Sequence, residues 1–168
     1  MKAIFFDRDG VINNNAINYY TINYKQWVFN PGIIETLKYL YKLKYSLFLV
    51  TNQGGISKGC CTKEQVEELH NKVFEELKRN EIEFTDVMIC PHHSDFENCL
   101  CRKPKSLMLE KLIAKYNIDV SKSWFIGDSN TDLEAAEKAG IKHIIIVEPN
   151  SNIESIIRSE RFAIGLYM

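Results

Sequence analysis

The chain has 168 residues, of which 45% are hydrophobic and 26% charged, and its formal net charge is −1. This length is enough for one domain with a proper core, so we expect residues 1–168 to form a single domain. The charge balance gives no reason to expect nucleic acid or a membrane surface as a partner, and no apolar stretch approaches the roughly 20 residues that a bilayer span needs. The N-terminus does not resemble a signal peptide, so the sequence favours a cytoplasmic protein.

Five short apolar runs, each about the length of a buried strand, alternate with helical patterns along the chain. Such alternation predicts an α/β fold of three layers, in which helices cover both faces of a Rossmann-like, five-stranded, mainly parallel sheet. No helical pattern carries an extra apolar stripe, so we expect a monomer. The expected strands are Lys2–Phe6, Ser46–Val50, Asp86–Cys90, Ser123–Ile126 and His143–Val147.

The expected helices each combine an apolar face with a signal at one end. Asn30-Pro31 predicts a helix whose N-cap is Asn30 and whose first turn contains the proline. The remaining helices are expected after a capping box at Thr62-x-x-Gln65, after Pro104, from near Thr131 to a stop at Gly140, and over Ile153–Arg158.

Two acids separated by one residue, Asp7 and Asp9, follow the first strand and precede Gly10. Ligands in folds of this kind bind beyond the carboxyl ends of the strands. Converging carboxylates repel unless a hard cation lies between them, and Mg²⁺ prefers oxygen ligands. A carboxylate is also a competent nucleophile toward phosphorus. Taken alone, the motif fits a surface turn rich in Asp and Gly equally well.

A second acidic segment, Gly127–Asp132, follows the fourth strand. Asp128 is placed to complete the Mg²⁺ coordination begun by Asp7 and Asp9. Asp132 lies one helical turn further on, where it could hold a metal-bound water or orient a lysine. The alternative is a helix N-terminus that is rich in acidic residues, which the helix dipole favours. For Asp132 this alternative explains the sequence equally well.

Hydrogen-bond donors and cations follow the other strands. Thr51-Asn52-Gln53 supplies a hydroxyl and two amides, and the glycines that begin at Gly54 let the backbone approach an anion. Arg102 could fork onto a substrate oxygen, and Lys103 could neutralise charge on a transferring phosphoryl group. Considered separately, these segments also fit a polar turn and a solvated surface loop.

Together the segments contain what phosphoryl transfer needs, which is an in-line nucleophile, a cation and donors around the moving group. Asp7 can form an aspartyl phosphate. Asp9 can protonate the leaving alkoxide and later activate the water that hydrolyses the intermediate.

A cluster of cysteines and histidines precedes the two cations. Cys90, His92, Cys99 and Cys101 have the C-x-H and C-x-C spacing of a closed, structural Zn²⁺ site, and the odd total of five cysteines disfavours a disulfide framework. Incidental cysteines are the alternative, and His93 is a weaker ligand candidate. A zinc-stabilised loop would hold both cations at the mouth of the site.

Four motifs in this order resemble those of the haloacid dehalogenase superfamily of phosphatases: Phe5–Gly10, Thr51–Gln53, Lys103 and Gly127–Asp132. The resemblance implies that Asp7 is the nucleophile and Asp9 the acid/base. It also implies that Mg²⁺ is bound by the Asp7 side chain, the Asp9 backbone carbonyl and Asp128, and that Thr51 and Lys103 steady the phosphoryl group. Many members carry a large cap domain, for which the stretches between these motifs have no room.

The runs Cys90–His93 and Cys99–Pro104, with Thr51–Ile56, are similar to those of the D-glycero-D-manno-heptose 1,7-bisphosphate phosphatases and the related histidinol-phosphate phosphatases. This resemblance implies removal of the 7-phosphate of a small phosphorylated sugar in the synthesis of activated heptose for surface polysaccharide. It also implies the four zinc ligands named above. The expected substrate contacts are Tyr20, Thr51, Asn52, Gln53, Gly54, Arg102, Lys103 and Ser129.

Two other functions remain open at this point. Histidinol phosphate carries a cationic amine that needs an acidic partner, whereas Arg102 and Lys58 favour a second phosphate. A receiver-type phosphorylatable signalling domain also has an acidic Mg²⁺ site on a parallel sheet. In receivers the phospho-accepting Asp ends a mid-chain strand, whereas here both leading acids follow the first strand.

Overall fold

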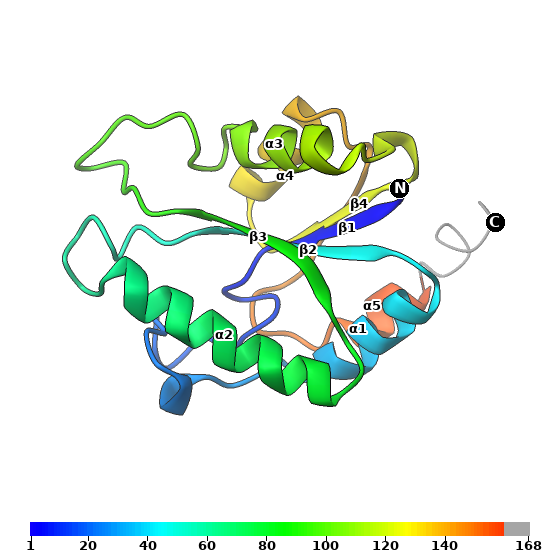
Figure 1. Ribbon diagram of the computed structural model, residues 1–168, viewed down its shortest axis with the longest axis horizontal. Helices are drawn as coiled ribbons and strands as arrows, with labels where there is room; N and C mark the ends of the chain where they lie inside the picture. Colours follow the sequence, from blue (N-terminus) through cyan, green and yellow to red (C-terminus); the bar gives the residue numbers. More distant parts are fainter. Residues whose placement is uncertain (160–168) are drawn as a thin grey trace.

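The structure, a computed structural model, describes residues 1–159, so residues 160–168 of the predicted domain lie outside the described part. A five-stranded sheet in the order β3-β2-β1-β4-β5 forms its middle layer, and every neighbouring pair of strands is parallel (Figure 1). This confirms the predicted fold class. The strands are β1 (Ala3–Phe6), β2 (Ser46–Asn52), β3 (Phe84–Cys90), β4 (Trp124–Gly127) and β5 (His143–Ile146).

Helices cover both faces of the sheet. In Figure 1, α1 (Ile33–Lys42), α2 (Lys63–Arg79) and α5 (Glu154–Ser159) lie below the sheet, and α3 (Leu107–Tyr116) and α4 (Asn130–Lys138) lie above it. Two 3₁₀ helices, η1 (Tyr24–Gln26) and η2 (Val120–Lys122), occur in the connections.

The central strand β1 contributes to a separate core on each side of the sheet. Ile4 and Phe6 pack on the side of α1, α2 and α5, and Ala3 and Phe5 pack on the side of α3 and α4. All four are fully buried. Because alternate side chains of a strand point to opposite faces, a strand buried on both sides must be apolar throughout. Burial of each of the large side chains contributes about 1.5–3 kcal/mol.

The sheet order also determines where the polar motifs meet. β1 lies between β2 and β4, and from β1 the chain moves first toward β3 and later toward β5. The backbone N–H of Asp7 extends the pairing by donating to the carbonyl of Ile126 on β4 (3.0 Å). The carboxyl ends of β1, β2 and β4 are therefore adjacent at the point where the strand order reverses, which is where open α/β sheets bind ligands.

The start of α1 differs from the prediction. Asn30 is not its N-cap; the helix begins at Ile33, and the cap is Gly32 with a φ of 73°. The reason is a competing role for the Asn30 amide, which donates to the carbonyls of Gly10 (2.7 Å) and Val11 (2.9 Å) in the loop after β1. The capping box of α2 is confirmed, with both of its hydrogen bonds between Thr62 and Gln65 present.

Strands β2 and β3 are each two residues longer than expected. Thr51 and Asn52 belong to β2, and β3 begins at Phe84. Within residues 1–159 the stretch between β1 and α1 contains only loop and η1, so no large cap domain is present there. No helix in this part of the chain is long and apolar enough to cross a bilayer.

Gly32 provides a test of how α1 and α5 fit together. A Cβ at Gly32 would lie 2.3 Å from Asn152 Oδ1 and 2.9 Å from Glu154 Cβ, whereas a Cβ at Gly59 would meet nothing within 4 Å. Both glycines have a positive φ, so alanine at either position costs about 1 kcal/mol. We expect Gly32→Ala to lower the free energy of unfolding by roughly a further 1–3 kcal/mol because of the overlap with the start of α5. Urea titrations of both variants measure the difference, and equal losses would contradict this packing.

Candidate active site

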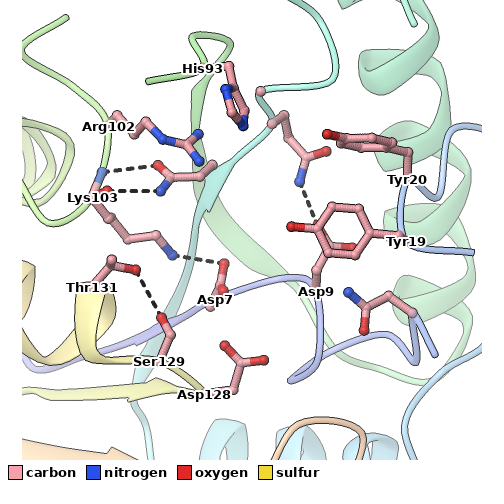
Figure 2. Close-up of a pocket in the computed structure, with 14 residues that line it drawn as sticks. Asp7, Asp9, Tyr19, Tyr20, His93, Arg102, Lys103, Asp128, Ser129 and Thr131 are labelled. Carbon is pink, nitrogen blue, oxygen red and sulfur yellow. Dashed lines mark hydrogen bonds and ion pairs between the residues drawn. The ribbon is translucent and has the colours of Figure 1, made fainter. Parts of the chain in front are cut away.

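A cavity of about 280 Å³ lies at the carboxyl ends of the central strands (Figure 2). Ten residues expected to act in catalysis, metal binding or substrate binding line it: Asp7, Asp9, Tyr20, Asn52, Gln53, Gly54, Arg102, Lys103, Asp128 and Ser129. The structure thus brings together motifs that are far apart in the sequence.

Lys103 is buried between two carboxylates. Its Nζ lies 2.8 Å from Asp7 Oδ1 and 2.6 Å from Asp132 Oδ1, and it also donates to the carbonyl of Val50 (2.9 Å). Burial acts to lower the pKa of Lys103, but the two carboxylates outweigh burial and raise it. The side chain is therefore a fixed cation beside Asp7.

Asp7, Asp128 and Asp132 form the acidic cluster. Each offers one oxygen, and these oxygens all lie within 4.8 Å of one another. Figure 2 shows Lys103 and Asp128 approaching Asp7 from two sides. Burial raises the pKa of Asp7 to about 7, although Lys103 opposes the shift, and burial together with Asp132 raises the pKa of Asp128 to about 6. Three carboxyl groups share the single cation of Lys103, and their oxygen donors fit Mg²⁺.

Gly10 allows Asp128 to reach this position. A Cβ at Gly10 would lie 2.0 Å from Asp128 Oδ2, and Gly10 has a φ of 82°. The glycine after the two acids is therefore required both by the turn and by the close approach of Asp128.

Asp132 orients its neighbours and has no solvent exposure. One carboxylate oxygen pairs with Lys103, and the other accepts from the backbone N–H of Asp128 (3.2 Å) and from Ser129 Oγ (2.7 Å). This arrangement matches the lysine-orienting alternative from the sequence.

The carboxylate of Asp9 lies apart from the acidic cluster, although it lines the cavity. It accepts from Gln53 Nε2 (2.7 Å) and Asn13 Nδ2 (3.1 Å), and it forms an ion pair with Arg8. These contacts occupy both oxygens of the Asp9 carboxylate.

The end of β2 supports the cavity in two ways. Asn52 forms two hydrogen bonds with the backbone of Lys103, accepting from its N–H (3.0 Å) and donating to its carbonyl (3.1 Å). Thr51 is buried and is not a lining residue; its hydroxyl accepts from Gln53 Nε2 (2.8 Å). Asn52 therefore fixes the backbone of Lys103, and Thr51 helps to orient Gln53.

The second cluster consists of Cys90, His92, Cys99 and Cys101, whose ligand atoms all lie within 4.8 Å of one another. Cys90 Sγ is 3.7 Å from Cys99 Sγ and 3.1 Å from Cys101 Sγ, and His92 Nδ1 is 3.2 Å from Cys101 Sγ. Ligand atoms around a tetrahedral zinc ion lie roughly 3.5–3.8 Å apart, so the set fits Zn²⁺ with small adjustments.

The cysteine cluster is connected directly to Arg102. The Arg102 backbone N–H donates to Cys99 Sγ (3.3 Å), and its Nη1 donates to the carbonyl of His92 (2.9 Å). The loop that carries the cluster therefore sets the position of the guanidinium in the active-site cavity.

Comparison with known proteins identifies the family. Residues 5–146 match the model of the haloacid dehalogenase-like hydrolases. The chain belongs to this family. It is 38% identical over 152 residues to a D-glycero-β-D-manno-heptose-1,7-bisphosphate 7-phosphatase of Haemophilus influenzae, with 87% of this chain and 81% of the relative covered. It is 37% identical over 146 residues to the D-glycero-α-D-manno-heptose-1,7-bisphosphate 7-phosphatase of Campylobacter jejuni, with 87% and 82% covered.

A solved structure supports the same family assignment. The D,D-heptose 1,7-bisphosphate phosphatase of B. bronchiseptica, crystallised with magnesium and phosphate, superimposes with a TM-score of 0.81. It is 25% identical, and the match covers 95% of this chain and 99% of that chain. The predicted resemblance to the phosphatases of the haloacid dehalogenase superfamily is thus confirmed.

The sequence did not predict four residues that line the cavity of this haloacid dehalogenase-like hydrolase: Asn15, Tyr19, His93 and Thr131. Asn15 and Tyr19 lie a few residues after the first motif, whereas His93 and Thr131 lie within recognised motifs at positions to which the sequence assigned no catalytic or substrate-binding role. The sequence indicates His93 only as a weaker zinc ligand. Its ring instead lies against Gly54, where an added Cβ would meet His93 Cδ2 at 2.8 Å.

The raised pKa values lead to a prediction about Mg²⁺ and pH. The folded protein without metal holds extra protons on Asp7 and Asp128, so its stability should fall as the pH rises from about 4 to about 7. Mg²⁺ competes with these protons, so saturating Mg²⁺ should raise the Tm by several degrees at about pH 8 and by much less at about pH 5.

Melting curves with and without Mg²⁺ at the two pH values measure this difference. In Asp128→Asn the Mg²⁺-induced shift at about pH 8 should be much smaller, because one ligand is lost. An equal shift at both pH values in the unaltered protein would exclude the carboxylate cluster as the site of binding.

Proposed function

We propose that this chain is a Mg²⁺-dependent phosphatase that removes the 7-phosphate of D-glycero-D-manno-heptose 1,7-bisphosphate through an aspartyl phosphate on Asp7. The observation that carries the proposal is the convergence of Asp7, Asp128 and Lys103 at one end of a cavity. The names of relatives that are 33–38% identical support the substrate.

The proposed reaction has two half-reactions. Asp7 Oδ attacks phosphorus and the ester bond breaks, while the Asp9 carboxyl gives its proton to the departing alkoxide. The Asp9 carboxylate then takes a proton from water, whose oxygen attacks the phosphorus of the acyl phosphate. Inorganic phosphate leaves and the Asp7 carboxylate is restored.

Charge control during transfer comes from residues already in place. The Nζ of Lys103, 2.8 Å from Asp7 Oδ1, balances charge on the phosphoryl oxygens. When bound by the Asp7 side chain, the Asp9 carbonyl and Asp128, Mg²⁺ would supply further positive charge at the same oxygens. Thr51 contributes through Gln53, whose amide its hydroxyl orients.

The charges around the cavity favour a bisphosphate over histidinol phosphate. Among the described residues that line the cavity, the acids are Asp7, Asp9 and Asp128, and all three have roles in the reaction. No fourth acid is present there to pair with the amine of histidinol, whereas Arg102 can pair with a second phosphate. Lys58 does not line the cavity and adds no support. The other proposed substrate contacts are Tyr20, Asn52, Gln53, Gly54 and Ser129.

A panel of substrates tests the function. We expect the kcat/KM for phosphate release from heptose 1,7-bisphosphate to exceed that for histidinol phosphate and for simple sugar monophosphates by at least about tenfold. Assaying both anomers of the bisphosphate establishes which is preferred. Equal, slow turnover of all substrates would reject the heptose assignment. A stable acyl phosphate without turnover would instead support a receiver-type domain.

Asp7→Asn is the matched control in the same assay. It should lower kcat by about 10³-fold or more, because the nucleophile is lost. Its zinc content by elemental analysis should be unchanged, since Asp7 is not part of the cysteine cluster. Retained activity in this variant would reject the covalent mechanism.

We also propose that Cys90, His92, Cys99 and Cys101 hold a structural Zn²⁺ that fixes Arg102. In Cys99→Ser we expect zinc to be lost and kcat/KM to fall roughly 10–100-fold, because Arg102 loses its support. Cys60→Ser is the control, since Cys60 is exposed and outside the cluster, and it should keep both zinc and activity. Full activity in a zinc-free Cys99→Ser protein would contradict this role.

A further inference from the structure

Arg8 lies between the nucleophile and the acid/base in the sequence, and the mechanism above gives it no role. The residue is fully buried, which is unusual for an arginine. A buried guanidinium needs a partner for its charge and for its five N–H donors, so its contacts indicate what it does.

The charge partner of Arg8 is Asp9, and the contact is bidentate. Arg8 Nε donates to Asp9 Oδ2 (3.1 Å), and Nη2 donates to Asp9 Oδ1 (2.9 Å). Two parallel bonds between a planar guanidinium and a planar carboxylate fix the rotation of the carboxylate as well as its position. Gln53 and Asn13 each add one more donor, so both oxygens of Asp9 are held.

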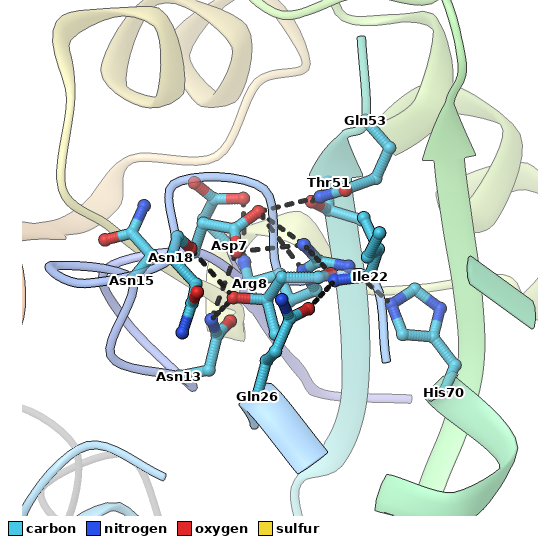
Figure 3. Close-up of polar contacts among 12 residues, drawn as sticks. Asp7, Arg8, Asn13, Asn15, Asn18, Ile22, Gln26, Thr51, Gln53 and His70 are labelled. Atoms are coloured by element: carbon cyan, nitrogen blue, oxygen red, sulfur yellow. Dashed lines mark hydrogen bonds and ion pairs between the residues drawn. The ribbon is translucent and has the colours of Figure 1, made fainter. Parts of the chain in front are cut away.

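The guanidinium is held in turn from its other side. Arg8 Nη1 lies 3.4 Å from His70 Nε2, and Nη2 lies 3.4 Å from the carbonyl of Thr21, which belongs to the loop after β1. Figure 3 shows Arg8 with His70 on one side and Asn13 on the other. His70 belongs to α2, which contributes no residue to the lining of the active-site cavity.

His70 is suited to accept a hydrogen bond from a cation. The residue is 4% exposed, and burial together with the neighbouring Arg8 lowers its pKa to about 3. The imidazole is therefore neutral. With its proton on Nδ1, Nε2 is free to accept from Arg8.

We propose that Arg8 is a positioning residue, anchored by His70 of α2, that holds the Asp9 carboxylate in the orientation needed to accept a proton from the water that hydrolyses the aspartyl phosphate. This inference rests on the proposed function. It links α2 to the second half-reaction through the sequence of contacts His70–Arg8–Asp9, and it assigns a catalytic consequence to a histidine that does not contact the cavity.

The two half-reactions separate this role from a general loss of structure. An aryl phosphate such as p-nitrophenyl phosphate has a leaving group that departs without a proton, so the first half-reaction does not need Asp9. Hydrolysis of the aspartyl phosphate still needs a base. A variant with a misplaced Asp9 should therefore release about one equivalent of nitrophenol per enzyme at the normal rate and then turn over slowly.

The variants are His70→Leu, which removes the acceptor for Arg8, and His70→Gln, whose amide oxygen can replace it. Rapid-mixing kinetics with p-nitrophenyl phosphate should show a burst at the normal rate in both. The steady-state kcat should be lower by roughly 10–100-fold in His70→Leu, with a smaller loss in His70→Gln. Arg8→Lys keeps the positive charge but cannot form the two parallel hydrogen bonds to Asp9, so it should resemble His70→Leu.

Val73→Ala is the structural control, because Val73 is buried on α2 outside this set of contacts. It should lower stability and leave both phases of the reaction close to normal. Two results would overturn the inference. One is a burst rate in His70→Leu that falls as much as its steady-state rate. The other is normal burst and steady-state rates in both His70→Leu and Arg8→Lys. An unaltered protein that hydrolyses no phosphate ester would instead reject the proposed function itself.

Discussion

The arrangement at the carboxyl ends of β1, β2 and β4 depends on the burial of charge. Lys103 and Asp132 are buried and the Asp7 side chain is 14% exposed, and removing charges from water costs several kcal/mol for each ion. The cost is offset only where opposite charges meet in good geometry. The positions of the polar residues are thus strongly constrained, and the strand ends, the Asn52 contact and the Gly10 turn all serve to keep these charges together.

One consequence is that Asp7, the proposed nucleophile, is held by its partners before any substrate arrives. Lys103 fixes Asp7, Asp132 fixes Lys103, and the backbone and side-chain donors after β4 fix Asp132. Such preorganisation lets donors act on developing charge without rearrangement, and electrostatic stabilisation of this kind usually accelerates a reaction more than any other effect in an active site. Asp9, the proposed acid/base, is held separately by Arg8, so the two carboxylates of the first motif have different surroundings although one residue separates them.

A second consequence concerns recognition. Residues 1–159 form no large cap over the sheet, and loops complete the cavity. Tyr19 and Tyr20 come from the loop after β1, and His93 and Arg102 come from the loop that carries the cysteine cluster. Residues 91–102, in the loop that carries the cysteine cluster, include no buried side chain, so the zinc ion proposed there would supply free energy to order this loop. Zinc binding would thereby connect the folding of the loop to the charge that Arg102 presents.

The sequence by itself determined the fold class, the approximate strands and helices, and the residue types of both clusters. It did so because period-two and helical patterns report burial directly, and because acids, amides and cysteines at fixed spacing have few chemical uses. It failed at the start of α1, where the Asn30 amide bonds to the loop after β1 across about 20 residues, a contact that local capping rules cannot register.

Only the tertiary structure decided which groups face which. It placed His70 beside Arg8, paired the Asp9 carboxylate with Arg8, Gln53 and Asn13, and put His93 in the cavity rather than among the cysteines. These outcomes depend on the approach of segments that are distant in sequence, such as α2 and β1. The orientation of a side chain within a shared site follows from packing and hydrogen-bond geometry between elements, neither of which leaves a periodic signal in the sequence.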